Sequence, residues 1–146
     1  MAKSPEKKEF LIPTDLSEVQ RASAKVLFFL KPHDLGEPNL FDIRLCLEEA
    51  LINAMKYGNR LQKDLKVRLS VEVDPGCEVR LTVEDKGTGF DVKKIEDCTR
   101  KENLFRNRGR GVYLIHQLMD DVKFNAKGNS VQMVKRLHGI SSKCHS

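Results

Sequence analysis

The 146-residue sequence has no tryptophan and only two tyrosines, so it offers few aromatic side chains on which nucleic-acid bases stack. It contains no apolar run that approaches the ~18 residues of a membrane-spanning helix. Residues 1–10 are charged and lack the apolar segment of a secretory signal. We therefore expect a cytoplasmic protein that neither spans a membrane nor binds nucleic acid directly.

Cysteine and histidine are sparse as well, with four of each. The cysteines form no CxxC pair, and no histidine stands beside a cysteine pair at the spacing of a zinc site. The histidines are therefore expected to be structural or surface residues. Reduced, unpaired thiols are expected at all four cysteine positions, which are Cys46, Cys77, Cys98 and Cys144.

The net charge of +5 is unevenly distributed along the chain. Residues 91–111 carry seven basic and four acidic side chains, and residues 135–146 carry three basic side chains and no acidic one. Residues 1–9 carry one excess positive charge, and the rest of the chain is slightly acidic. No long basic face is evident, which argues against a nucleic-acid surface.

The length and the 40% hydrophobic content are those of a single globular domain. Apolar residues at helical spacing predict helices at 19–30, 40–57 and 112–119. Caps and breakers set the ends of the first two helices: Asp15 or Ser17, Pro32, Asn39 and Gly58.

Alternating apolar and polar residues predict strands. The expected strands are 9–13, 67–73, 79–83, 122–124 and 131–137. Turns are expected at Asp74-Pro75-Gly76 and at Lys127-Gly128-Asn129. Residues 86–111 show no regular element, and so long an irregular stretch is typical of a functional or mobile segment. The order predicts an α+β sandwich with helices on one face of a mixed, mostly antiparallel sheet.

The first motif lies on the second predicted helix. Glu49 and Asn53 are four residues apart and therefore share a helix face. A carboxylate there can accept a proton from a hydroxyl, and an amide oxygen suits Mg²⁺. Lys56 can bring positive charge to the same ligand. A solvated helix face has the same composition, so this motif alone does not decide the function.

The second motif follows a predicted strand. Asp85, Gly87 and Gly89 form an Asp-x-Gly-x-Gly sequence in which the glycines let the backbone approach a ligand closely. An aspartate at such a bend can accept a hydrogen bond from an exocyclic amine such as that of adenine. A plain strand-ending turn remains the alternative.

The third motif, Arg108-Gly109-Arg110-Gly111-Val112, opens the last predicted helix. Free N–H groups and the positive dipole end at a helix N-terminus attract phosphate, and Arg106 adds charge nearby. The motif is not a P-loop, and no GxGxxG follows a strand in a βαβ unit. A flexible basic loop remains the alternative.

Taken in this order and spacing, the three motifs resemble the GHKL (Bergerat) ATP-binding superfamily, which includes gyrase, heat-shock chaperones, histidine kinases and MutL-type repair proteins. The resemblance covers residues 10–137 and leaves 1–9 and 138–146 as flexible tails. The chain most resembles the anti-sigma factor serine kinases, because a strand and a helix precede the Asn53 motif. The segment from Gly109 to Val122 is also similar to their closing part.

The resemblance implies a role for each motif residue. Glu49 matches the general base and Asn53 matches the Mg²⁺ ligand. Asp85 matches the aspartate that binds adenine, with Gly87 and Gly89 shaping that wall, and residues 91–110 match a lid over ATP. Nucleotide contacts are implied for a further set, which comprises Lys56, Arg106, Arg108, Gly109, Arg110, Gly111 and Val112. Which of the three arginines meets the γ-phosphate stays open.

The activity that the resemblance implies is that of an ATP- and Mg²⁺-dependent protein serine/threonine kinase that is also an anti-sigma factor. Its substrate would be a STAS-type anti-sigma factor antagonist, it would sequester a sigma factor, and it would form a homodimer. Two alternatives remain open. The motifs also suit an ATP-gated partner-binding module without kinase activity, and Lys56-Tyr57 suits a detached histidine-kinase-type ATP-binding domain. The positive charge of residues 91–111 is assigned to the triphosphate of one nucleotide or to an acidic protein partner.

Overall fold

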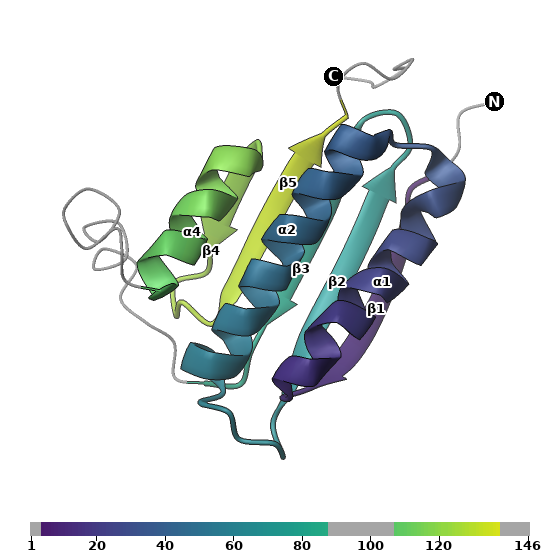
Figure 1. Ribbon diagram of the computed structural model, residues 1–146. Helices are drawn as coiled ribbons and strands as arrows, with labels where there is room; N and C mark the ends of the chain where they lie inside the picture. Colours follow the sequence, from purple (N-terminus) through teal and green to yellow (C-terminus); the bar gives the residue numbers. More distant parts are fainter. Residues whose placement is uncertain (1–3, 88–106, 138–146) are drawn as a thin grey trace.

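The computed structural model describes residues 4–87 and 107–137, with the backbone alone for 107–110. In these ranges five strands form one open sheet, and three α-helices cover one of its faces (Figure 1). The sheet order is β1-β2-β3-β5-β4, and every pairing is antiparallel. The strands are β1 (Glu6–Pro13), β2 (Lys66–Asp74), β3 (Glu78–Glu84), β4 (Asp121–Phe124) and β5 (Ser130–Arg136). The expected α+β fold is confirmed, although the described pairings include none of the parallel pairs of a mixed sheet.

The central strands form as their alternation predicts. Val71 of β2 pairs with Leu81 of β3, and both are completely buried beneath the helices. The hairpin between them turns at Pro75-Gly76, where Gly76 has a φ of 78°, a left-handed conformation that glycine adopts without steric cost.

Strand β1 begins at Glu6, three residues before the predicted start at Glu9. Residues 6–9 of the expected N-terminal tail are therefore part of the sheet, paired with residues 70–73 of β2. Their side chains are exposed, so no alternation marks them as a strand. Backbone pairing at the sheet edge, which leaves no trace in the hydrophobic pattern, makes this segment extended.

Helix α1 (Val19–Leu30) follows a 3₁₀ turn, η1 (Leu16–Glu18). Of the two predicted caps, Asp15 acts on η1 and not on α1 itself, because its Oδ1 accepts a hydrogen bond from the Ser17 N–H at 3.0 Å. Glu18, at the N-cap of α1, makes no side-chain cap hydrogen bond. The hydrogen bonds from the side chain and backbone of Ser17 lower the pKa of the Asp15 carboxyl. A second 3₁₀ turn, η2 (Lys31–His33), contains Pro32 and ends this segment as predicted.

Helix α2 (Glu37–Asn53) begins earlier and ends earlier than predicted. Gly36 stands at the N-cap and Pro38 in the first turn, a position where proline costs no hydrogen bond. The predicted cap, Asn39, lies inside that turn and donates from its side chain to the Leu35 carbonyl at 2.7 Å. A π-helical turn, η3 (Ala54–Gly58), follows α2 directly.

Helix α4 (Asn107–Leu118) starts five residues before its predicted start at Val112. Gly109 and Gly111 therefore lie within the helix and do not precede it. None of the helices in the described ranges is long and apolar enough to cross a membrane.

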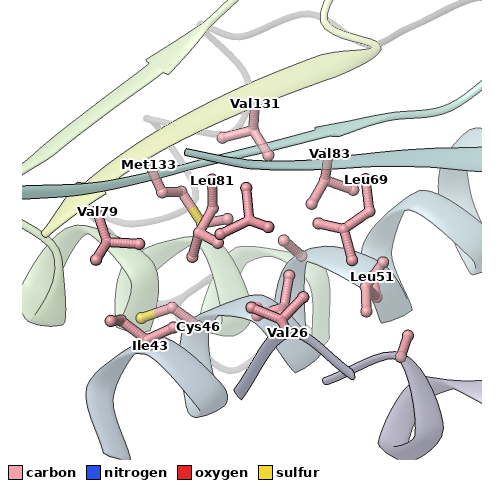
Figure 2. Packing of buried hydrophobic residues seen from close by; sticks show 14 of the residues in the cluster. Val26, Ile43, Cys46, Leu51, Leu69, Val79, Leu81, Val83, Val131 and Met133 are labelled. Carbon is pink, nitrogen blue, oxygen red and sulfur yellow. The ribbon is translucent and has the colours of Figure 1, made fainter. Parts of the chain in front are cut away.

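The core lies between the helices and the covered face of the sheet. In Figure 2, Ile43 and Cys46 of α2 point toward Val79, Leu81 and Met133 of the sheet, and all five are completely buried. Burial raises the pKa of the Cys46 thiol to about 12, since the thiolate would lose its hydration there.

The expectation of four unpaired thiols is correct at one described position and wrong at the other. Cys46 is a free thiol, whereas Cys77 is disulfide-bonded. Cys98 and Cys144 lie outside the described residues.

Candidate functional site

Two motif residues of α2 face the start of α4. A Cβ atom added to Gly111 would lie 2.7 Å from Glu49 Oε2 and 3.3 Å from Asn53 Nδ2. The first distance is shorter than real Cβ contacts and the second is tight, so a side chain at position 111 would require the Glu49 carboxylate to move. Glu49 and Asn53 therefore share a face, as their spacing predicts, and Gly111 completes it.

Asn53 lies where two pockets meet. The Asp85 pocket combines aliphatic walls with polar side chains, and the Glu49 pocket contains a carboxylate, an amide and an ammonium group. The Asp85 pocket is lined by Ala50, Asn53, Ala54, Val83, Asp85, Val112, Ile115, Phe124, Gly128, Asn129, Ser130 and Val131. The Glu49 pocket is lined by Glu49, Ile52, Asn53, Lys56, Tyr57, Gly111, Tyr113 and Leu114. One ligand with an apolar ring and an anionic tail could occupy both.

Asp85 is a buried carboxylate, only 7% exposed, at the end of β3. Its Oδ1 accepts a hydrogen bond from the Gly87 N–H at 2.8 Å. A Cβ atom on Gly58 would lie 2.2 Å from Asp85 Cγ, so the backbone of η3 packs directly on the carboxylate. This packing holds a hydrogen-bond acceptor in the wall of an otherwise largely apolar pocket.

Lys56 and Tyr57 belong to the π-helical turn and both line the Glu49 pocket. The Lys56 Nζ lies 5.6 Å from the centroid of the Tyr57 ring, within the range of a cation–π contact. The π-helical turn thus places a positive charge in the same pocket as Glu49 and Asn53. Lys56 and Tyr57 were predicted to lie in the α-helix, which in the structure ends at Asn53.

The structure gives no side-chain surroundings for five of the predicted site residues. Gly89 and Arg106 lie outside the described residues. The structure describes Arg108, Gly109 and Arg110 only as backbone of α4. Val112 is buried and lines the Asp85 pocket.

Part of the lining of the Asp85 pocket comes from the β4–β5 turn, and the sequence did not predict this. Asn125 shapes that turn, because its Oδ1 accepts hydrogen bonds from the N–H groups of Asn129 at 3.0 Å and Ser130 at 3.2 Å. The Asp85 N–H donates to the Asn129 carbonyl at 2.9 Å. Gly128 and Asn129 look like ordinary turn residues in the sequence, so only the fold identifies them as lining residues.

No cluster of three or more His, Cys, Asp or Glu side chains that could hold a metal ion occurs in the described part of the chain.

Comparison with known families gives the site its context. The histidine kinase-like ATPase domain family matches residues 12–135. The chain belongs to this family. The match contains both pockets and all of the described motif residues, and it confirms the GHKL-type fold expected from the three motifs.

Curated relatives of this family member include kinases and an anti-sigma factor. Over 105 residues the chain is 32% identical to the serine-protein kinase RsbW of Listeria monocytogenes, which covers 66% of each chain. Over 132 residues it is 28% identical to the anti-sigma F factor of Bacillus velezensis, covering 85% of this chain and 88% of the relative. Over 102 residues it is 28% identical to RsbW of Staphylococcus aureus, covering 64% of each. The match to RsbW thus spans about two thirds of that protein's length.

Proposed function

We propose that the chain is an ATP- and Mg²⁺-dependent protein serine kinase that acts as an anti-sigma factor. It would phosphorylate a STAS-type antagonist and sequester a sigma factor. The observation that carries the proposal is the face shared by Glu49, Asn53 and Gly111 at the junction of the two pockets. The names of the relatives, serine-protein kinase RsbW and anti-sigma F factor, support the choice of partners.

The Asp85 pocket suits the adenine ring. Its aliphatic side chains offer apolar surface to the faces of a flat base, and Asp85 offers a hydrogen-bond acceptor to the exocyclic amine. The ribose and triphosphate would then extend past Asn53 into the Glu49 pocket. Lys56 lines that pocket, and its ammonium would offset part of the negative charge of the phosphates.

Asn53 fits the role of Mg²⁺ ligand, because its neutral amide oxygen is of the type that hard cations prefer and its side chain stands between the two pockets. Bound Mg²⁺ would neutralise phosphate charge during phosphoryl transfer. In this proposal the ion would be held largely through the nucleotide, so its binding would depend on ATP.

Glu49 would act as the general base. Its carboxylate would accept the proton of a serine hydroxyl while the serine oxygen bonds to the γ-phosphorus and the bond to the departing ADP oxygen breaks. The carboxylate lies close to Gly111, since a Cβ atom added there would be 2.7 Å from Glu49 Oε2.

The test is phosphoryl transfer from γ-labelled ATP to candidate antagonists. We expect acid-stable phosphoserine on one of them, and we expect Glu49→Gln to abolish transfer while ATP still binds. Acid-labile phosphate on a histidine-bearing partner would favour the histidine-kinase-type alternative. Two results together would favour the ATP-gated module. Partner binding would respond to ATP without any phosphoryl transfer, and the Glu49→Gln variant would behave like wild type.

A further inference from the structure

Asn59 follows the π-helical turn, and its side chain is buried between three segments of the chain. The residue is 1% exposed. Its Oδ1 accepts a hydrogen bond from the Lys86 N–H at 2.8 Å, and its Nδ2 donates to Thr14 Oγ1 at 2.9 Å and to the Lys66 carbonyl at 3.3 Å. Since both ends of the amide are satisfied, its orientation is fixed.

The backbone of Asn59 is anchored as firmly as its side chain. Its N–H donates to the Ala54 carbonyl at 2.8 Å, and its own carbonyl accepts from the Gln62 N–H at 3.0 Å. The next two residues, Arg60 and Leu61, have left-handed φ values of 52° and 59°. Non-glycine residues enter this region only when surrounding contacts compensate the steric cost, and such strain concentrates at functional sites.

The hydrogen bond to Lys86 places Asn59 next to the ligand wall, because Lys86 follows Asp85 directly. Asn129 holds the same segment from the opposite side: it accepts from the Asp85 N–H at 2.9 Å and donates from Nδ2 to the Asp85 carbonyl at 3.3 Å. Gly58, the residue before Asn59, packs on the carboxylate itself. The bend at Asp85 is therefore held between η3 and the β4–β5 turn.

We propose that Asn59 is a positioning residue for Asp85. Its amide oxygen fixes the peptide between residues 85 and 86, and this peptide sets the direction in which the Asp85 carboxylate meets the exocyclic amine of the nucleotide base. The inference rests on the proposed function, in which Asp85 binds adenine. It makes the turn after the Glu49–Asn53 helix a part of the base-selecting wall, so one continuous segment would serve both the phosphates and the base.

The experiment compares the affinities for ATP and for purine riboside triphosphate, which lacks the 6-amino group, by titration calorimetry. Wild type should prefer ATP by about tenfold, the effect of one hydrogen bond to a charged acceptor. Asn59→Ala should reduce that preference at least about threefold. The matched control, Thr14→Val, breaks the same network on the side away from Asp85 and should keep the preference even if thermal stability falls.

Each result decides between a positioning role and a structural one. An Asn59→Ala protein that binds both nucleotides more weakly by the same factor would overturn the inference, because a structural defect does not distinguish the two bases. A wild type that binds ATP without preference for the 6-amino group would also overturn it, and ATP binding would stand. A wild type that binds neither nucleotide would overturn the proposed function and, with it, this inference.

A measurement on the wild-type protein keeps the inference testable if Asn59→Ala does not fold. The Lys86 amide should exchange its hydrogen at least about 100-fold more slowly than an open-chain amide, because Asn59 accepts its hydrogen bond. Exchange at the rate of an unprotected amide would contradict the proposal.

Discussion

The substitution Gly111→Ala is expected to affect the rate of phosphoryl transfer without lowering the free energy of unfolding. The residue lies within α4 and does not have a positive φ, so alanine suits its conformation. Alanine is favoured over glycine inside a helix by about 0.5–1 kcal/mol. The added Cβ would lie 2.7 Å from Glu49 Oε2, whereas an ordinary contact begins at 3.4 Å.

The overlap falls on the far end of a flexible side chain, so it is relieved by turning the Glu49 carboxylate and not by moving a helix. We therefore expect Gly111→Ala to leave the free energy of unfolding unchanged or to raise it by up to ~1 kcal/mol. Misplacing a catalytic group by about 1 Å costs roughly 100-fold in rate. The shift required of Glu49 is somewhat smaller, so we expect the rate of phosphoryl transfer to fall by roughly 10- to 100-fold.

The assay pairs urea unfolding with phosphoryl transfer from γ-labelled ATP, and calorimetry with Mg–ATP reports binding separately. Glu49→Gln serves as the reference for complete loss of the base. The reasoning is refuted if Gly111→Ala unfolds more easily by over 1 kcal/mol, or if it transfers phosphate at the wild-type rate.

Three further predictions address the Asp85 wall, the core and one ion pair. Gly58→Ala would place its Cβ 2.2 Å from Asp85 Cγ, so ATP affinity should fall at least about tenfold in calorimetry, and an unchanged affinity would count against the packing described. The pKa of Cys46 is raised from 9.0 to about 12, so its stabilising effect is complete below pH 9 and is lost as the pH rises toward 12. Between pH 8 and pH 10.5, wild type should therefore lose about 2 kcal/mol more unfolding free energy than Cys46→Ala, and parallel losses in urea titrations would contradict the burial effect. Lys135→Met should lower the unfolding free energy by about 1–3 kcal/mol, because the Lys135 Nζ lies 2.8 Å from Asp42 Oδ2 and both side chains are mostly buried; Lys135→Arg, which keeps the charge, should lose less.

Local patterns predicted most of the fold. The β2–β3 hairpin follows from strict alternation on both sides of Pro75-Gly76, and α1 follows from apolar residues at helical spacing before Pro32. The start of β1 at Glu6 could not be predicted in this way, since its polar side chains are exposed and only its pairing with β2 makes it a strand.

The π-helical turn escaped prediction for a different reason. Residues 54–57 continue the apolar pattern of a helix, so the sequence favours an α-helix up to Tyr57. In the structure the wider turn brings Gly58 and Asn59 against the Asp85 segment, and such tertiary contacts override local preference.

The candidate site was predictable where its residues share one element. The spacing of Glu49 and Asn53 places both on one face of α2, and the structure bears this out. The wall formed by Asn129 and Ser130 was not predictable, because Asn129 is 44 residues from Asp85 and meets it only through the pairing of β3 with β5. The spacing of residues within one helix or strand does not indicate which distant residues will be in contact.

Thermal unfolding with and without Mg–ATP tests the central claim most directly. A ligand that binds only the native state stabilises it by mass action, by about 2.7 kcal/mol at 100 times its Kd. We predict that millimolar Mg–ATP raises the Tm of the wild-type protein by several degrees, and that Asn53→Ala and Asp85→Ala lose most of this shift. A wild-type Tm that does not change with millimolar Mg–ATP would contradict the assignment of the two pockets to one ATP molecule.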